Sequence, residues 1–219
     1  MPLHFAVVTQ NLGTFASGAS MTLLVSLIAI AIGMCGGITL SFILLSKRTV
    51  PRRIARVYVS FFRGTPLLAQ LLLAYYFLPG LIGVDLPPLA AAIGALALNT
   101  TAFQAEIYRG GILAIAHGQI EAARILGITT WQARRRILIP QVMRLVLPSL
   151  INETISIVKN SSLISVIAVT ELLRVSQGLV AVTFRPTEIY IAAAVIYLVM
   201  NLVLAQLGRW SERRLSRHV

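Results

Sequence analysis

Five long apolar segments set the strongest limit on how this chain can fold. They cover about residues 22–45, 57–79, 88–115, 142–169 and 187–207. Each is near the roughly 20 residues that a helix needs to cross the hydrocarbon of a bilayer. A backbone that crosses lipid must satisfy its own hydrogen bonds, so these segments are expected to be helices rather than isolated strands. The sequence therefore predicts an all-α, polytopic membrane protein with five transmembrane helices.

The composition supports this prediction. Hydrophobic residues make up 57% of the 219 residues, and charged residues only 12%. A soluble domain carries about a quarter charged residues, and a soluble chain this apolar would expose large apolar patches. We expect one transmembrane domain over residues 1–219, since no linker, low-complexity stretch or internal repeat divides the chain.

The basic residues predict how the chain is oriented. Lysines and arginines cluster after the first, third and fifth segments, whereas the opposite connections hold only Arg174 and Arg185, offset by acidic residues. Cytoplasmic loops carry the excess of basic residues in membrane proteins. We therefore predict an amino terminus outside the cell and a carboxyl terminus in the cytoplasm. The net charge of +12 does not indicate nucleic-acid binding, because the basic residues are divided among separate loops.

Side chains suited to metal, cofactor or enzyme chemistry are scarce. Cys35 is the single cysteine, and the three histidines, His4, His117 and His218, lie far apart and outside the apolar segments. We predict no disulfide, no metal or haem site, no cofactor and no catalytic residue. The phosphate-binding pattern GxxxxGK[ST] is also missing from the sequence, so no nucleotide site is predicted.

One connection carries a specific motif. The loop at about residues 117–141 contains the triplet Glu121-Ala122-Ala123, then Gly127 after three residues, and the stretch Ile137-Leu138-Ile139-Pro140 after nine more. This pattern resembles the EAA loop of ABC importer permeases, which reads EAA, three positions, Gly, nine positions, Ile, any residue, Leu-Pro. The one departure is Ile139, where leucine is usual.

Three further stretches narrow the resemblance to the polar amino acid uptake branch, which includes the histidine and glutamine permeases. They are Phe62 to Gln70 (FRGTPLLAQ), Ala105 to Ile112 (AEIYRGGI) and Lys159 to Leu163 (KNSSL). The resemblance extends from about Thr22 to the carboxyl terminus. It implies a type I, MetI-like permease fold in the bacterial plasma (inner) membrane, and transport of a polar amino acid.

The resemblance also implies partners and a coupling site. A cytoplasmic dimer of ATP-binding subunits would dock on the EAA loop through Glu121, Ala122, Ala123 and Gly127, and would supply ATP hydrolysis. A second permease subunit, identical or homologous, and an external solute-binding protein would complete the importer. From the residues alone, the small alanines allow another protein to approach closely, and Gly127 permits a turn that ends a helix. A membrane-surface helix with snorkelling basic residues is the alternative for this loop.

The fourth apolar segment offers a polar stripe for a substrate pathway. At about 100° per residue, Glu153, Ser156 and Asn160 fall on one face, and Lys159 flanks it. An ionisable residue within a membrane span is costly and therefore indicates function. An amino acid needs an acceptor for its ammonium group, which Glu153 provides, and a donor for its carboxylate, which Lys159 provides. The alternative is that both charges stabilise the fold by pairing with neighbouring spans.

The third segment holds further candidates. Asn99 and Gln104 are predicted to line the passage, although polar side chains also form hydrogen bonds between membrane helices. Glu106 and Arg109 have the i,i+3 spacing of helical neighbours and are expected to form a structural pair. In the second segment, Thr65-Pro66 is expected to break or kink the helix.

A stand-alone secondary amino acid transporter or channel is the main alternative function. It would need coupling-ion carboxylates and usually inverted repeats, and neither is found in the sequence. An intramembrane protease would need a base beside its nucleophile, but no apolar segment holds a histidine. The identity of the amino acid is left open: Glu153 favours a basic side chain, whereas Asn160 in place of an acidic residue weakens that preference.

Overall fold

The computed structural model describes residues 4–115, 118, 123 and 125–216. The described residues contain helices and no strand, which confirms the prediction of an all-α fold. In chain order the elements are α1 (Ala6–Gln10), α2 (Leu12–Leu45), α3 (Thr49–Gly64), α4 (Leu67–Leu72), the π-helical turn η1 (Leu73–Phe77), α5 (Leu78–Ile82), α6 (Pro88–Leu113), α8 (Thr130–Ala133), the π-helical turn η2 (Arg134–Leu138), α9 (Ile139–Asn160), the 3-10 segment η3 (Ser161–Ile167), α10 (Leu172–Thr183) and α11 (Pro186–Ser216).

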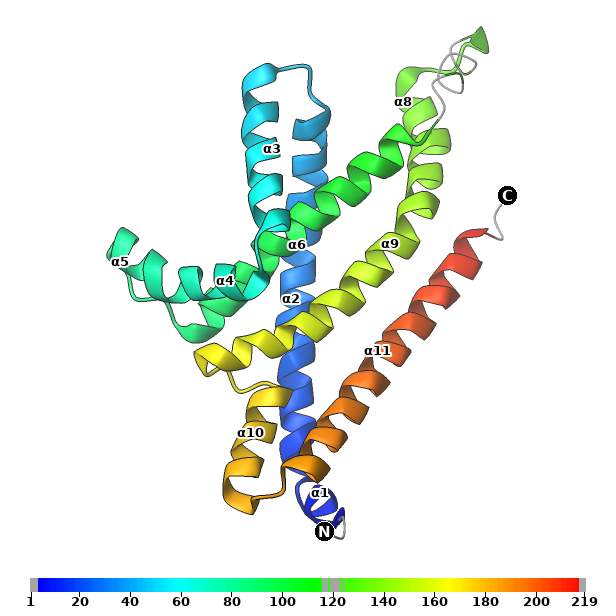
Figure 1. Ribbon diagram of the computed structural model, residues 1–219. Helices are drawn as coiled ribbons and strands as arrows, with labels where there is room; N and C mark the ends of the chain where they lie inside the picture. The colour runs from blue at the N-terminus through cyan, green and yellow to red at the C-terminus, as the bar shows by residue number, and fades with distance from the viewer. Residues whose placement is uncertain (1–3, 116–117, 119–122, 124, 217–219) are drawn as a thin grey trace.

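Helix α2 runs through the middle of the fold, and its contact with α6 is the most extensive between two elements (Figure 1). Glycines make this contact close. A methyl group added at Gly33 would lie 2.5 Å from Thr100 Cγ2, and one added at Gly37 would lie 2.9 Å from Gln104 Cβ. Small residues let membrane helices approach in this way. On the other side of α6 follow α9 and then α11, each packed on its neighbour.

Helix α3 runs back beside the end of α2, and the chain then turns sharply into α4 (Figure 1). The axes of α3 and of the following α4–α5 stretch differ by 109°. Pro66 has no backbone N–H, and a residue before proline avoids helical geometry. Thr65 accordingly adopts φ −118° and ψ 150°. The kink predicted at Thr65-Pro66 is present, and the segment 57–79 is therefore not one straight helix.

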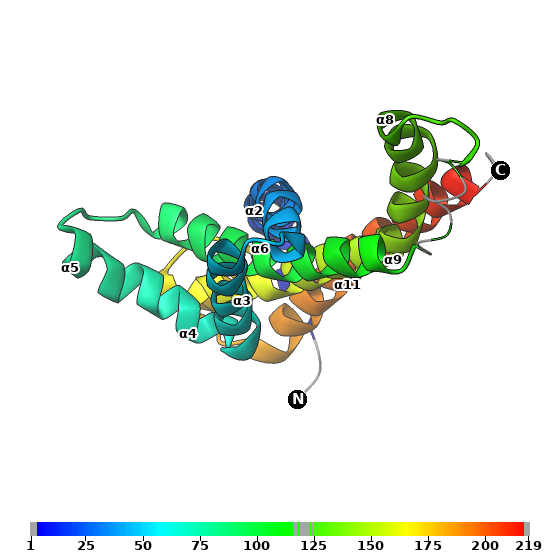
Figure 2. The ribbon, with the colours of Figure 1, turned by 90° about the horizontal axis from the view of Figure 1, so that it is seen from above.

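The segment predicted over residues 142–169 is divided in a related way. Helix α8, the turn η2 and α9 form one continuous helical segment from Thr130 to Asn160, called the rod below, which bends between α8 and α9 (Figure 2) and which η3 extends. Ala168 then adopts a left-handed conformation with φ +62°. Helix α10 leaves at an angle of 50° to the rod. A long helix, a 3-10 segment and a turn thus replace the single span.

Two helices, α2 and α11, are each long and apolar enough to cross a membrane. The number rises to four if each bent pair forms one span. Helix α6, the third span predicted from the sequence, is not among these helices. The polar side chains from Asn99 to Gln104 lie in its middle. Length and composition of the described helices alone therefore do not reproduce the predicted count of five.

The basic clusters gather at one end of the molecule. The turn between α2 and α3, helix α8 and the carboxyl-terminal end of α11 lie at this end, whereas α1 and α10 lie at the other (Figure 1). Seen from above, α5 and α8 project to opposite sides of α2 (Figure 2). Lys47 lies in the turn between α2 and α3, Arg135 in η2 directly after α8, and Arg214 in α11. The basic loops separated along the sequence are thus brought together in space.

Candidate functional site

The polar stripe predicted on the fourth segment lies on α9. Val146 and Leu150 of this helix are buried against Tyr108 of α6. The predicted site residues lie on the rest of its surface: Lys159 and Asn160 are exposed, and Glu153 and Ser156 are partly buried. The stripe therefore occupies the part of α9 that the described helices leave largely uncovered.

A charged residue on another helix also acts on this stripe. Arg63, at the carboxyl-terminal end of α3, interacts electrostatically with the Glu153 carboxyl group. Its guanidinium carbon lies 5.3 Å from the centre of the Phe103 ring on α6. Among the described residues, the side chains of Glu153 and Lys159 form no hydrogen bond or short ion pair. Both signs of charge are thus available where α3, α6 and α9 come near one another.

Asn99 takes part in a buried amide network at the end of α3. Its Nδ2 donates to the Phe62 carbonyl at 3.1 Å and to Gln70 Oε1 at 2.9 Å. Gln70 Nε2 in turn donates to the carbonyls of Phe62 and Thr65 at 2.9 and 3.1 Å, and to Thr65 Oγ1 at 2.8 Å. This is the interhelical bonding that the sequence left as an alternative for Asn99. Its role in a passage stays a prediction.

Gln104 is also enclosed by helices. Its side chain is 1% exposed, and its Cβ lies beside Gly37 of α2. The Oε1 atom is buried without a hydrogen-bond partner among the described residues. The structure therefore places Gln104 in the contact between α2 and α6, and its predicted role in a passage is likewise left as a prediction.

Glu106 and Arg109 form the pair that their spacing predicts. Arg109 Nη2 lies 2.6 Å from Glu106 Oε2, and Arg109 Nε lies 3.1 and 3.0 Å from the two carboxylate oxygens. The side chains are partly exposed, so the pair contributes little to stability. It fixes a local arrangement on α6.

The EAA loop, at about residues 117–141, falls partly outside the described residues. Glu121 and Ala122 lie outside them, whereas Ala123 is described and is 3% exposed. The Ile128 N–H donates to the Ala123 carbonyl at 2.9 Å, and Gly127 adopts φ +74°. This six-to-one bond around a left-handed glycine is the Schellman ending of a helix. The turn predicted at Gly127 is therefore confirmed.

The next helix begins immediately after this turn. Thr129 Oγ1 accepts from the Gln132 N–H at 3.3 Å, and Gln132 Oε1 accepts from the Thr129 N–H at 3.1 Å. This reciprocal capping box fixes the start of α8. The chain from Gly127 to Thr130 is thus shaped by local backbone chemistry.

The EAA loop also exposes large apolar side chains. Ile125 is 86% exposed, Leu126 76% and Trp131 65%. The guanidinium of Arg135 lies 5.1 Å from the centre of the Trp131 ring. Apolar side chains exposed this far, with basic residues beside them, mark a surface for another protein or a membrane.

These features agree with the comparison to known families. The family described as "Binding-protein-dependent transport system inner membrane component" matches residues 33–217. The chain belongs to this family. The resemblance suggested by the EAA loop is therefore confirmed, and this permease has the MetI-like fold expected from it.

Its relatives include permeases for several amino acids and related compounds. The chain is 36% identical to the arginine transport system permease protein ArtQ of Bacillus subtilis, over 99% of each chain. It is 34% identical to the glutamine transport system permease protein GlnP of Escherichia coli K12, again over 99% of each. It is 38% identical to the octopine transport system permease protein OccM of Rhizobium meliloti, over 99% of this chain and 94% of the relative.

Solved structures show the same fold. An amino acid ABC transporter crystallised with histidines aligns with a TM-score of 0.90 at 39% identity, over 98% of this chain and 100% of the other. The MetNI methionine ABC transporter aligns with a TM-score of 0.79 at 20% identity, over 94% of this chain and 98% of the other. This second likeness concerns the fold alone. Membership of the family places the permease in the inner membrane and implies an ATPase and a binding protein as partners.

One buried carboxylate of the permease was missed by the sequence reasoning, which counted it only as an offset to basic residues. Glu171 is 0% exposed and caps the amino-terminal end of α10. Its oxygens accept from the N–H groups of Leu173 and Arg174 at 2.8 and 2.7 Å, and from Tyr197 Oη of α11 at 2.7 Å. The neighbouring Leu172 N–H donates to Thr22 Oγ1 of α2 at 3.2 Å. Three helices therefore meet at this site.

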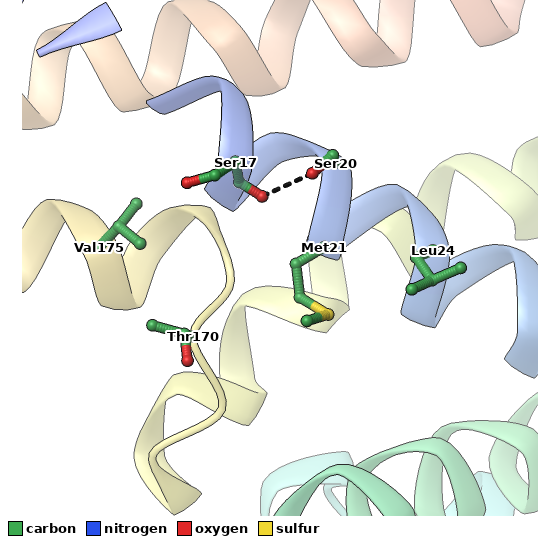
Figure 3. Close-up of a pocket in the computed structure, with 6 residues that line it drawn as sticks. All are labelled: Ser17, Ser20, Met21, Leu24, Thr170 and Val175. Atoms are coloured by element: carbon green, nitrogen blue, oxygen red, sulfur yellow. Dashed lines mark hydrogen bonds between the residues drawn. The ribbon is translucent and has the colours of Figure 1, made fainter. Parts of the chain in front are cut away.

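A hollow of about 560 Å³ lies nearby between α2 and the start of α10. Figure 3 shows its lining, which consists of Ser17, Ser20, Met21, Leu24, Thr170 and Val175. Ser20 Oγ donates to the Ser17 carbonyl at 2.7 Å. The lining has hydroxyl groups and apolar side chains but no charge. It therefore does not offer the pair of opposite charges that an amino acid requires.

Proposed function

We propose that this chain is the transmembrane subunit that carries a polar amino acid across the bacterial plasma membrane, coupled through the segment around Gly127 to a separate ATPase. One observation carries the coupling mechanism. The exposed Trp131 and the polar residues from Glu153 to Asn160 lie on the same continuous helical rod. A helix rises about 1.5 Å per residue, so these 31 residues span roughly 45 Å along the helix path. Movement at the docked end is thereby transmitted to the polar stripe.

We propose that the chain crosses the membrane five times. The crossings are α2, the α3–α5 pair, α6, the rod with α10, and α11. The gathering of the basic loops at one end supports a cytoplasmic position for that end, with the amino terminus outside and the carboxyl terminus inside. The polar middle of α6 is compatible with a crossing because α2 covers it.

The substrate pathway is proposed to run along α9. Glu153, Ser156, Lys159 and Asn160 line it, with Arg63 on the opposing side. Asn99 and Gln104 shape its wall, since they hold α4 and α2 against α6. The zwitterion meets Glu153 through its ammonium group and Lys159 or Arg63 through its carboxylate.

The partners follow from surfaces that one chain leaves open. A polar, charged stripe facing lipid is costly, so a second permease subunit, identical or homologous, is expected to cover α9. The exposed apolar and basic loop supports docking of a cytoplasmic dimer of ATP-binding subunits, which performs ATP hydrolysis. An external solute-binding protein delivers the amino acid at the opposite end.

The coupling role is tested with two glycines that share the same backbone conformation. Gly127 and Gly83 have φ +74° and +68°, and neither has an atom within 4 Å of an added Cβ. Valine strains both positions equally. Gly127→Val is expected to abolish ATP-driven uptake in proteoliposomes containing the ATPase and binding protein, whereas the control Gly83→Val keeps it. Equal uptake by both variants would remove Gly127 from the coupling mechanism.

The substrate role of Glu153 is tested in the same proteoliposomes with arginine and glutamine supplied through matched binding proteins. Glu153→Gln keeps size and hydrogen bonding but removes the charge. We expect a loss of about tenfold in apparent affinity for arginine, because a hydrogen bond to a charged group contributes about 1.5 kcal/mol or more. The control Glu106→Gln removes a charge from α6 and should leave uptake unchanged. Uptake without ATP would instead support the stand-alone transporter.

A further inference from the structure

The start of α3 concentrates positive charge that forms no ion pair within the described part of the chain. Five basic residues, Lys47, Arg48, Arg52, Arg53 and Arg56, fall within ten positions. The described residues form two ion pairs, Glu106 with Arg109 and Glu188 with Arg185, and neither involves this cluster. The Nε of Arg52 is buried without a hydrogen-bond partner among them. An anion bound at this cluster would therefore be stabilised by its positive charge.

The helix backbone adds to this stabilisation. The first turn of α3 holds no acidic residue, and no side chain caps its N–H groups. The amino-terminal end of a helix carries a partial positive charge, so cations are unfavourable there and an anion is stabilising. Arg48, Arg52 and Arg53 stand at this end, where their charges repel the helix dipole as well as one another.

The same helix also exposes an apolar stripe. Val50 is 69% exposed, Ile54 66%, Val57 70% and Phe61 45%. Their spacing of four, three and four residues places them on one face. The opposite face is buried, with Ala55 and Val59 packed against α2 and α6.

The neighbouring helix α2 also exposes apolar side chains. Helix α2 is apolar and long enough to cross a membrane, and α3 packs beside its carboxyl-terminal part. On that part of α2, Ile38 and Phe42 are 43% and 63% exposed. Arg53 borders the stripe, three residues after Val50 and four before Val57, and the exposed Arg56 follows Arg53 at i,i+3 spacing. Both lie near the start of α3, at the end of the molecule where the other basic loops gather.

We propose that the start of α3 is a binding site for an anionic phospholipid. Arg53 and Arg56, both exposed, hold the headgroup phosphate, and the stripe from Val50 to Phe61 contacts the acyl chains. Charge complementarity favours an anion, and the length of the apolar stripe favours a lipid over an acidic protein surface. The site rests on the insertion of α2 in a membrane and not on which amino acid is carried. A failed transport assay would therefore leave it untouched.

The test measures lipid bound to the full-length permease in complex with its ATPase. The complex is exchanged into nanodiscs that contain phosphatidylglycerol and phosphatidylcholine, extracted gently, and examined by native mass spectrometry. We expect phosphatidylglycerol to be retained preferentially, and retention to fall as salt is raised. Each basic residue near an anionic surface contributes about fivefold in binding. The double variant Arg53→Gln, Arg56→Gln should therefore retain about 25-fold less.

A matched control removes the same charge from the same end of the molecule. Arg209→Gln with Arg214→Gln lies on exposed residues of α11 and should retain phosphatidylglycerol as the parent does. Equal losses in the two double variants would show diffuse attraction and overturn the site. Displacement of the lipid by millimolar inorganic phosphate would show a simple anion site without acyl-chain contacts, which also overturns the proposal. So would loss of ATPase association with unchanged lipid retention, because the occupant would then be the protein partner.

Discussion

The two bends of this permease, at Thr65-Pro66 and after Ala168, leave opposite kinds of backbone group without a helical partner, and different side chains satisfy them. At the first bend, α3 ends at Gly64 and leaves carbonyl groups without their helical partners. At the second, α10 begins at Leu172 and leaves N–H groups without theirs. Helix ends always expose these two kinds of group, carbonyls at the carboxyl end and N–H groups at the amino end. The molecule therefore requires donors at one bend and acceptors at the other.

Neutral amides meet the need at the first bend. Gln70 and Asn99 supply N–H donors to the carbonyls of Phe62 and Thr65. Gln70 also accepts from Asn99, so the two amides support each other. Both residues are buried, at 4% and 5% exposed, and no charge is involved in the network.

A carboxylate meets the need at the second bend. Glu171 accepts two backbone N–H groups and the Tyr197 hydroxyl, and Thr22 accepts the remaining N–H of Leu172. Hydrogen bonds to a charged acceptor are stronger than neutral ones. We therefore expect the second bend to be held more strongly than the first, and mainly by the side chain of Glu171.

The largest expected effect comes from removing that side chain. Glu171→Leu leaves two backbone donors and the Tyr197 hydroxyl without an acceptor, and each buried orphan costs about 1–3 kcal/mol. We expect a loss of about 3 kcal/mol or more in unfolding free energy, measured by unfolding in mixed detergent micelles. Glu171→Gln keeps one acceptor oxygen and should lose less. A loss under about 1 kcal/mol for the leucine variant would reverse the ranking of the two bends.

A smaller effect is expected at the first bend. Gln70→Leu removes the donor shared by Phe62 and Thr65, but Asn99 still donates to the Phe62 carbonyl. We expect a loss of about 2 kcal/mol, measured in the same way. The double variant with Asn99→Leu should depart from additivity by about 0.5 kcal/mol or more, because the two amides contact each other. Strict additivity would show that they act independently.

The smallest effect is expected from the single neutral bond at the second bend. Thr22→Val keeps the shape of a side chain that is 0% exposed and removes only the acceptor of the Leu172 N–H. We expect a loss of about 1 kcal/mol, and Thr22→Ser serves as the control that keeps the hydroxyl group. If Thr22→Val lowered the unfolding free energy as much as Glu171→Leu does, the Glu171 carboxylate would not be the main stabilising group at the second bend.

Local features were predicted well from the sequence. The kink at Thr65-Pro66, the turn at Gly127 and the Glu106–Arg109 pair depend on residues within a few positions of one another. Helix periodicity, the missing N–H of proline and the conformational freedom of glycine act over that range. The EAA loop likewise could be read as a linear pattern.

The partners of polar side chains could not be predicted in this way. Asn99 and Gln104 have the same residue types as pathway residues, yet they are enclosed by neighbouring helices. An amide on a helix face forms hydrogen bonds equally well with water, substrate or another helix, so its sequence position does not select among them. Only the neighbour brought there by the fold decides.

By itself, the sequence determined that this protein is an all-helical membrane permease with an EAA loop, because hydrophobic period and short motifs are local properties. The tertiary structure decided which groups close the bends. Gln70 meets Asn99 across 29 positions, Glu171 meets Tyr197 across 26, and Leu172 meets Thr22 across 150. A freed backbone group takes whichever complementary side chain packing brings within about 3 Å, and that distance is set only when all the helices are in place.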